Sequence, residues 1–253
     1  MCALGLKDNL VGRSRDCDFP PFVEELPICT DFAFIESLHP DVILVESVES
    51  LGARPAGDVK IVTYKPQSLR DFWEGISRIA EALQVAEEGK NKIALYKNKM
   101  TAIQNKGGEL NPGPKVAALG WIDPLMGSGH WVPELINLAH GTDLFGKPGR
   151  PSQPLNYDDL INSDPDIIVV FPSGFNIEET RDQLELFSTK KGWFDLKAVQ
   201  HNKVFLIDGN HYLNRPSPRL VDSVEMLAEI FHPDDFDFGH KNSGWQYWGF
   251  NRF

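Results

Sequence analysis

Two histidines in expected loops are candidates for binding a metal centre. His130 lies in the run Met126-Gly-Ser-Gly-His-Trp131, and His211 follows a short apolar run. A neutral imidazole can ligate cobalt or iron, or it can simply form a hydrogen bond. Both interpretations stay open at this point. A zinc site built from His130 and Glu134 is disfavoured, because Pro133 lies between them and the spacing differs from the helical pair of a metalloprotease.

Motifs that indicate an enzyme are absent from the sequence. It contains no Gly-x-Ser-x-Gly elbow, no Walker loop and no dinucleotide fingerprint. The three cysteines, Cys2, Cys17 and Cys29, lack the paired spacing of a zinc site, and their odd number gives no complete disulfide framework. We therefore expect no catalytic residues, no resident metal and no cofactor.

Charge and hydropathy exclude further classes. The chain has 253 residues and a formal net charge of −11, so it repels phosphate backbones and nucleic acid is not an expected partner. No apolar run reaches the roughly 18 residues of a membrane span. The start, Met1 to Leu6, is too short for the apolar region of a signal peptide, so a cytoplasmic location stays open.

Apolar and β-branched runs alternate with helical stripes along the chain, which predicts an α/β fold with parallel sheets. Residues 35–45 and 160–170 share a short helix, then Pro-Asp, then a buried strand, which indicates two similar lobes. The alternative is that Pro-Asp simply begins many strands. Expected strands are 9–12, 42–45, 59–64, 116–121, 167–171 and 204–207, and expected helices are 34–38, two runs without a turn cluster within 67–110, one from Pro133, 158–162 and 218–231.

We expect three segments: an N-terminal lobe over 1–66, bridging helices over 67–110 and a C-terminal lobe over 111–253. The last lobe ends in an aromatic tail, Phe236 to Phe253, that is too aromatic to be disordered. Either this tail packs on the lobe or it contacts a partner.

Three longer motifs carry a family resemblance. They are Leu10-Val-Gly-Arg-Ser-Arg-Asp-Cys-Asp-Phe-Pro-Pro21, Gly129-His-Trp-Val-Pro-Glu-Leu135 and Asp208-Gly-Asn-His-Tyr-Leu-Asn-Arg-Pro-Ser-Pro-Arg-Leu-Val-Asp222. From about Leu4 to Pro233 the chain resembles the helical-backbone solute-binding proteins of ABC importers, which take up cobalamin, haem and ferric siderophores. It is most similar to their cobalamin-binding branch.

The resemblance implies two lobes with parallel-rich sheets, joined by a rigid long helix and closing on a corrinoid. It also implies a monomer at the periplasmic or cell surface that delivers its ligand to an ABC permease. Haem or a ferric siderophore is the alternative ligand, and a cytosolic corrinoid-handling protein without a transporter is the alternative role. Relatives carry a strand before the segment that matches Cys2-Ala-Leu-Gly-Leu6 and more chain between Pro27 and Phe32, so the first lobe is expected to be shortened.

The ligand is expected between the lobes, against loops that follow the strands. Amide arms of a corrinoid suit Arg, Asp and Asn side chains, and its flat ring suits aromatic faces. The first lobe offers Arg15, Asp16, Asp18, Phe19 and Glu46, and the second offers Trp121, Asp123, Gly129, His130, Trp131, Phe171, Phe175, Asn210, His211, Tyr212, Asn214 and Arg215. Other interpretations remain: Asp16 and Asp18 as turn residues, Trp131 as a core residue, and 210–215 as a solvated loop.

Permease docking in this class is implied to use one acidic residue per lobe, on the helix before the Pro-Asp strand. Asp158 or Asp159 occupies that place in the second lobe. In the first lobe Ala33 stands at the matching position and Glu36 lies one turn away. The alternative is that these acids are simply favoured near a helix N-terminus by the macrodipole.

Overall fold

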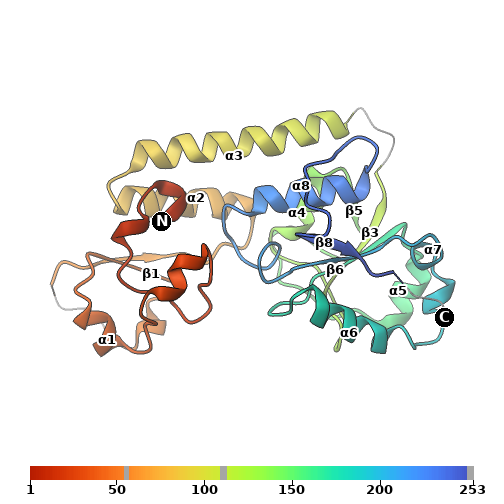
Figure 1. The fold of residues 1–253 in the computed structure, drawn as a ribbon, viewed down its shortest axis with the longest axis horizontal. Helices are drawn as coiled ribbons and strands as arrows, with labels where there is room; N and C mark the ends of the chain where they lie inside the picture. The colour runs from red at the N-terminus through yellow and green to blue at the C-terminus, as the bar shows by residue number, and fades with distance from the viewer. Residues whose placement is uncertain (54–56, 109–112, 250–253) are drawn as a thin grey trace. The chain divides into compact units, whose positions relative to one another are not determined.

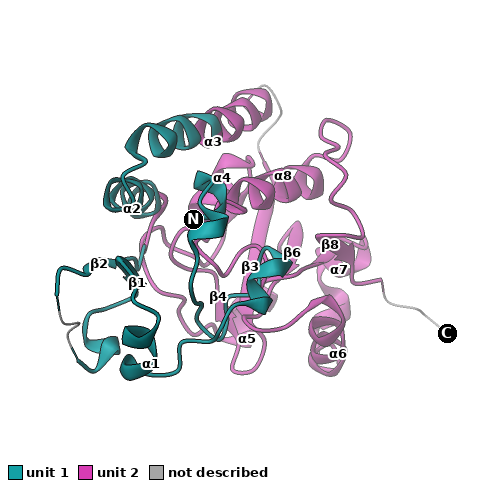
Figure 2. Cartoon of the chain, turned by 60° about the vertical axis from the view of Figure 1, so that its left-hand side comes forward, with its two compact units in different colours: residues 1–66, 70–95 teal, residues 67–69, 96–253 magenta. Residues whose placement is uncertain are grey.

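The computed structural model describes residues 1–53, 57–108 and 113–249 (Figure 1). The chain divides into two compact units (Figure 2). Unit 1 comprises Met1–Pro66 and Arg70–Leu95, and unit 2 comprises Gln67–Leu69 and Tyr96–Phe253. The boundary between Leu95 and Tyr96 falls inside helix α3, Ala86–Gly107. The helices of the 67–110 region are therefore shared between the two units and do not form a third body.

Unit 1 is built on a small parallel sheet. Strand β1, Val42–Val45, pairs with β2, Lys60–Thr63, in the register Val42 to Lys60. Helix α1, Phe32–Ser37, precedes β1 and begins at Asp31, whose side chain accepts a hydrogen bond from the backbone of Phe34 at 2.9 Å. The strands predicted over 42–45 and 59–64 and the helix predicted over 34–38 are thus confirmed.

The first residues of unit 1 differ from the expectation. The predicted strand over 9–12 is wrong, because Lys7–Asn9 forms a 3₁₀ helix and an isolated parallel bridge joins Arg13 to Ile28 instead. Further 3₁₀ turns span Cys2–Leu4, Pro21–Glu25 and Glu49–Leu51. Short runs such as Leu10–Gly12 have no neighbouring strand to pair with here, and pairing rather than composition decides a strand.

Helix α2, Leu69–Ala82, and helix α3 are separate helices, with a break at Leu83–Val85. Gln84 adopts a left-handed conformation, φ 61°. A Cβ on Gly89 would overlap the Ala80 side chain, so glycine at this position lets the two helices approach closely. The sequence carries no glycine or proline in the break itself, which is why the pattern did not reveal it.

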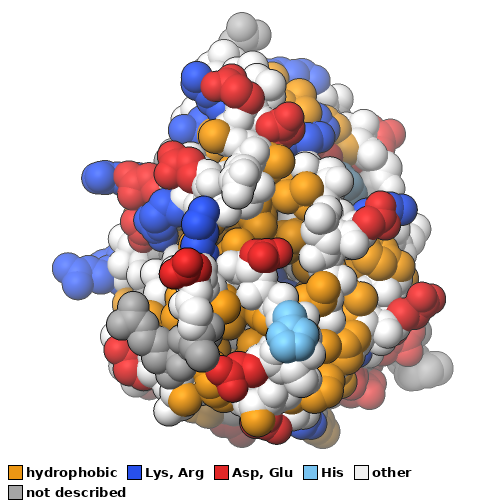
Figure 3. Space-filling model, turned by 90° about the vertical axis from the view of Figure 1, so that its left-hand side faces the viewer, with side chains coloured by type: hydrophobic (Ala, Val, Ile, Leu, Met, Phe, Trp, Pro, Cys, Tyr) orange, Lys and Arg blue, Asp and Glu red, His pale blue; other side chains and the backbone are white. Residues whose placement is uncertain are grey.

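The core of unit 1 lies between α2 and the sheet. Leu4, Ile79 and Ala80 are buried there and pack against Val62 and Tyr64, among others. Burial raises the pKa of the Tyr64 phenol far above its ordinary value. Apolar side chains also reach the surface among charged ones (Figure 3). The large apolar side chains of unit 1 that are exposed are Val11, Phe19, Ile28, Leu44, Val48 and Leu95.

Unit 2 contains a larger mixed sheet in the order β4-β3-β6-β7-β8, with β5 beside β3. Its central strands, β3, β6 and β7, are parallel, whereas β4 and β8 are antiparallel to their neighbours. Helices cover both faces (Figure 1), so β6 and β7 are fully buried and read as unbroken apolar runs. The strands are β3 Lys115–Trp121, β4 Met126–Gly127, β5 Thr142–Asp143, β6 Ile167–Val170, β7 Val204–Ile207 and β8 Trp245–Tyr247.

The helices of unit 2 include one that the sequence reading overlooked. Helix α6 begins at Asn176 with a capping box, in which Asn176 and Glu179 each bond the other's backbone at 2.9 Å. Behind it, Trp193 lies fully buried in the core against Phe187. The helices are α4 Val132–Leu138, α5 Tyr157–Ser163, α6 Ile177–Phe187, α7 Lys197–Gln200 and α8 Leu220–Phe231, with a 3₁₀ turn at Trp193–Asp195.

The described part of the aromatic tail packs on unit 2. Strand β8 pairs with β7, with Trp245 opposite Ile207. Trp248 is buried and meets Trp193 edge-on, with ring centroids 5.9 Å apart. Phe250 and Phe253 lie outside the described residues.

Candidate functional site

The candidate residues of unit 2 gather at one edge of its sheet. Because β3, β6 and β7 run parallel, their carboxyl ends meet there, which is where ligands bind in open α/β sheets. Trp121 closes β3, Phe171 follows β6 and Asp208 follows β7. We call the side chains that follow these three strands, with the 208–215 loop, the strand-end site.

Asp208 and His211 form the most ordered polar pair of the strand-end site. The backbone N–H of His211 donates to Asp208 Oδ1 at 2.9 Å, and the ring Nδ1 lies 2.8 Å from Asp208 Oδ2. A proton on Nδ1 that is donated to this carboxylate leaves Nε2 with a free lone pair. A carboxylate that orients an imidazole in this way is the usual support of a histidine metal ligand. Asp208 was not among the predicted ligand-binding residues, although it opens the third motif.

The rest of the loop is fixed by contacts with neighbouring backbone. Asn214 Nδ2 donates to the carbonyl of Phe171 at 2.8 Å, and Arg215 donates to Asn210 Oδ1 at 2.7 Å. A Cβ on Gly209 would collide with the same carbonyl of Phe171. The interpretation of 210–215 as a solvated loop is therefore not supported, because Asn214 ties the loop to the backbone of Phe171 and Arg215 ties it to its own Asn210.

Tyr212 is half-buried within the same loop. Its ring lies under the guanidinium of Arg219, 5.8 Å from the centroid. Burial raises the pKa of Tyr212, with a smaller contribution from Asp222, so its hydroxyl keeps its proton as a hydrogen-bond donor.

Two aromatic rings form an apolar wall at the strand-end site. Trp121 and Phe175 lie with ring centroids 5.3 Å apart and planes tilted by 40°. The indole nitrogen of Trp121 donates to the carbonyl of Asp123 at 2.8 Å, which fixes the ring. Both rings are half-buried, so part of each faces solvent.

Gly129, Trp131 and Phe171 have structural roles. Trp131 is buried and its indole nitrogen donates to the carbonyl of Leu213 at 2.9 Å, which favours its interpretation as a core residue. Phe171 is also buried, with 2% of its surface exposed. Gly129 makes room for the backbone of Ser152, and not for an approaching ligand. The expectation that these residues offer faces to a ligand is corrected accordingly.

His130 lies beside Trp131, with ring centroids 5.6 Å apart. Its backbone N–H donates to the carbonyl of Arg150 at 2.6 Å, and its φ of 54° is in the left-handed region. The residue is thus placed by its main chain, and its ring is half-buried.

Four of the five unit 1 candidates lie in the loop before the 3₁₀ turn Pro21–Glu25. Arg15, Asp16 and Phe19 are exposed and Asp18 is half-buried. Glu46, after β1, is exposed and forms a surface ion pair with Lys65 at 3.5 Å, an interaction that contributes little to stability. The sequence reading overlooked Arg13, whose guanidinium binds the carbonyls of this loop.

The acidic residues expected to dock a permease are exposed on two helices. Asp158 and Asp159 lie in the first turn of α5, and Asn156 donates to the carboxylate of Asp159 at 3.1 Å. Glu36 is exposed on α1. Their role in docking stays a prediction.

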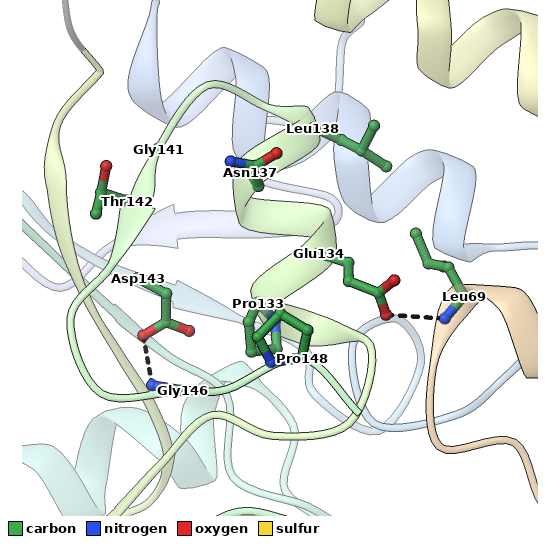
Figure 4. A pocket seen from close by; sticks show the side chains of 10 residues that line it. All are labelled: Leu69, Pro133, Glu134, Asn137, Leu138, Gly141, Thr142, Asp143, Gly146 and Pro148. Atoms are coloured by element: carbon green, nitrogen blue, oxygen red, sulfur yellow. Dashed lines mark hydrogen bonds between the residues drawn. The ribbon is translucent and has the colours of Figure 1, made fainter. Parts of the chain in front are cut away.

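A pocket of about 440 Å³ lies elsewhere in unit 2, beside α4 (Figure 4). Glu134 accepts a hydrogen bond from the backbone of Leu69 at 2.9 Å, and Asp143 accepts from Phe145 at 3.0 Å and Gly146 at 2.9 Å. Both carboxylates are thus occupied by the chain itself. None of the predicted ligand-binding residues lines this pocket, so we do not assign it to the strand-end site. Its lining is Leu69, Pro133, Glu134, Asn137, Leu138, Gly141, Thr142, Asp143, Gly146 and Pro148.

Two further features bear on the class of protein. Within residues 1–53, 57–108 and 113–249, no three His, Cys, Asp or Glu side chains are grouped so that they could hold a metal ion. In the same part of the chain, no helix has both the length and the apolar character that crossing a bilayer requires.

A family model described as periplasmic binding protein matches residues 31–210. The chain belongs to this family. Periplasmic binding proteins are non-enzymatic transport components, which confirms the prediction that the chain is not an enzyme.

Individual periplasmic binding proteins resemble the chain over most of its length. The uncharacterized ABC transporter substrate-binding lipoprotein YvrC of Bacillus subtilis is 25% identical, over 92% of this chain and 76% of YvrC. The vitamin B12-binding protein of Vibrio cholerae is 22% identical, over 89% of this chain and 82% of that protein. The periplasmic heme-binding protein RhuT of Roseiflexus superposes with a TM-score of 0.75 at 22% identity, over 92% and 93% of the two chains. These likenesses confirm the predicted α/β fold class.

Proposed function

We propose that the chain is the substrate-binding protein of an ABC importer and that its ligand is a corrinoid such as cobalamin. Its membership of the periplasmic binding protein family supports the importer role. The names of the YvrC and vitamin B12-binding relatives support an ABC transporter and a corrinoid, respectively. The lipoprotein name of YvrC and the description of the family as periplasmic support a location outside the cytoplasm.

The strand-end site is the observation that carries the corrinoid proposal. It combines a partly exposed aromatic wall, Trp121 and Phe175, with an ordered polar loop over 208–215. A corrinoid presents a flat macrocycle surrounded by amide arms. The aromatic wall suits the ring, and the hydroxyl of Tyr212 and the guanidinium of Arg215 suit the amide oxygens.

Haem is the second candidate, and the pairing of Asp208 with His211 favours it. An imidazole oriented by a carboxylate suits an axial position on iron, and equally a cobalt centre with an open axial position. The heme-binding name of RhuT supports this candidate. A ferric siderophore is less well supported, because Arg215 is the one arginine among the candidate residues of the strand-end site.

The test is a calorimetric and visible-absorbance titration of the full chain with cyanocobalamin, with haemin in parallel. We expect saturable one-to-one binding of cyanocobalamin at micromolar affinity or better. Tight haemin binding with a shifted Soret band, and no cyanocobalamin binding, would replace the corrinoid by haem. Binding of neither would refute both ligands and leave the family membership intact.

Axial ligation is tested separately with cob(III)inamide, whose axial positions are open to exchange. His211→Ala should remove the shift in the cobalt spectrum if His211 ligates the metal, and His130→Ala provides the comparison. Unchanged spectra in both variants would exclude ligation by either histidine while leaving the binding proposal in place.

We also propose that Asp158, Asp159 and Glu36 contact the permease. All three are exposed, and a carboxylate on the surface suits a basic partner. Asp158→Asn with Asp159→Asn should lower transport in cells while ligand affinity stays unchanged. Asp182→Asn, on the exposed side of α6, is the matched control.

A further inference from the structure

Arg13 holds a loop of unit 1 through its side chain. Its Nη1 donates to the carbonyls of Cys17 at 3.0 Å, Arg15 at 3.1 Å and Ser14 at 3.4 Å. Its Nη2 donates to the carbonyl of Glu24 at 3.4 Å. A single guanidinium thus joins four carbonyls of the 14–24 segment.

The backbone of Arg13 gives this guanidinium a fixed base. The N–H of Arg13 donates to the carbonyl of Pro27 at 3.0 Å, and the carbonyl of Arg13 accepts from the N–H of Cys29 at 2.8 Å. These bonds form the parallel bridge between Arg13 and Ile28. Arg13 therefore connects the 14–24 segment, through its side chain, to residues 27–29, through its backbone.

The loop that Arg13 holds carries four of the five unit 1 candidates, Arg15, Asp16, Asp18 and Phe19. Its own backbone contributes a turn, in which the N–H of Cys17 donates to Ser14 at 3.2 Å. Arg15, Asp16 and Phe19 are exposed on it, with 49% of Phe19 accessible. A loop whose side chains are mostly exposed is stabilised little by burial of apolar surface. Its conformation therefore depends on polar contacts such as those of Arg13.

We infer that Arg13 is a positioning residue, which orders the 14–19 loop so that its exposed side chains are ready for the ligand. The inference rests on the proposed function, since it assigns Arg13 to the binding of that ligand. A loop that is ordered beforehand loses less conformational entropy on binding, which strengthens affinity without a new contact. The role needs arginine, because a planar fork of five donors reaches several carbonyls at once and a lysine ammonium does not.

The experiment compares Arg13→Lys with the unmodified full chain in two measurements. The first is amide hydrogen exchange of residues 14–19 without ligand, and the second is the calorimetric affinity for cyanocobalamin. We expect exchange in the loop to be about tenfold faster and affinity to be about tenfold lower. Arg70→Lys is the matched control, because Arg70 is exposed in the same unit and its side chain bonds Glu74 at 2.8 Å. It should change neither measurement.

The two measurements separate this inference from the proposed function. Unchanged exchange in Arg13→Lys would overturn the positioning role whether or not a ligand binds. Faster exchange with unchanged affinity would overturn its part in binding. If the unmodified chain binds neither cyanocobalamin nor haemin, the proposed function and the binding part of the inference fail together, and exchange alone decides the ordering of the loop. Arg13→Gln, which keeps two donors, replaces Arg13→Lys if that variant does not fold.

Discussion

The carboxylate of Glu229 accepts a hydrogen bond from the indole nitrogen of Trp245 at 2.6 Å. It also accepts from the backbone N–H groups of Phe238 at 2.5 Å and His240 at 3.2 Å. Glu229 is buried on α8, with 4% of its surface exposed. Three hydrogen-bond donors of the tail thus bind the one buried carboxylate of Glu229, and these bonds hold residues 238–245 against α8.

Replacing this carboxylate should destabilise unit 2. Glu229→Gln keeps the shape but weakens three charge-assisted hydrogen bonds, and we expect a loss of about 2–4 kcal/mol in the free energy of unfolding. Urea denaturation followed by tryptophan fluorescence measures it. Glu185→Gln, exposed on α6, should stay within about 0.5 kcal/mol of the unmodified protein. Equal stability of the two variants would contradict the role of Glu229.

A methyl group at position 209 should disturb the strand-end site. In Gly209→Ala the new Cβ would lie 2.8 Å from the carbonyl carbon of Phe171, which is backbone and cannot rotate away. We expect a loss of about 1–3 kcal/mol in the free energy of unfolding. Gly108→Ala is the control, because the nearest atoms there lie at an ordinary 3.5 Å. Thermal denaturation of both variants decides whether the close approach at Gly209 matters.

The aromatic wall should contribute to ligand affinity. In Phe175→Leu the ring that lies against Trp121 is lost, and we expect cyanocobalamin affinity to fall about tenfold. Phe194→Leu removes a partly exposed ring elsewhere in unit 2 and should leave affinity unchanged. Calorimetric titration of both variants is the measurement. A similar change in both would show that the wall does not contact the ligand.

Stability should fall in mild acid because of His232. Burial, and then the neighbouring His140, lowers the pKa of His232 below its ordinary value. Below that ordinary value the unfolded chain binds a proton that the folded chain does not, so the free energy of unfolding falls as the pH falls from about 6.5. His232→Asn should flatten this slope, as measured by urea denaturation at pH 7.5 and 5.5. An unchanged slope would indicate that other groups cause the acid sensitivity, and His201→Asn is the exposed comparison.

Local patterns were sufficient for the central strands and several helices. The apolar runs at 167–171 and 204–207 predicted β6 and β7, because strands buried on both faces need unbroken apolar sequence. The run at 42–45 predicted β1, although Leu44 of that strand is exposed. Helix α6 was overlooked because charged residues separate its apolar positions, although the capping box of Asn176 and Glu179 was a usable signal.

Contacts between distant residues account for what the sequence did not reveal. Strand β8 contains a glutamine and two aromatic residues, which is not a strong strand pattern. It forms because it pairs with β7 and because the indole of Trp245 donates to the carboxylate of Glu229. At the candidate site, parallel topology correctly placed the 208–215 loop at the ends of the strands. The burial of Trp131 depends on a bond to Leu213, 82 positions away, which no local pattern shows.

Strand β8 lies at one end of its sheet, and such a strand offers unpaired backbone groups to other molecules. Arg181 of α6 donates to the carbonyls of Trp248 at 2.7 Å and Tyr247 at 3.1 Å, and to the side chain of Gln246 at 2.9 Å. The backbone carbonyl of Tyr247, and that of Trp248 directly after the strand, are therefore already bonded within the chain. We expect this contact to disfavour the addition of a foreign strand at the β8 end of the sheet, and so to lower the tendency of the protein to aggregate there.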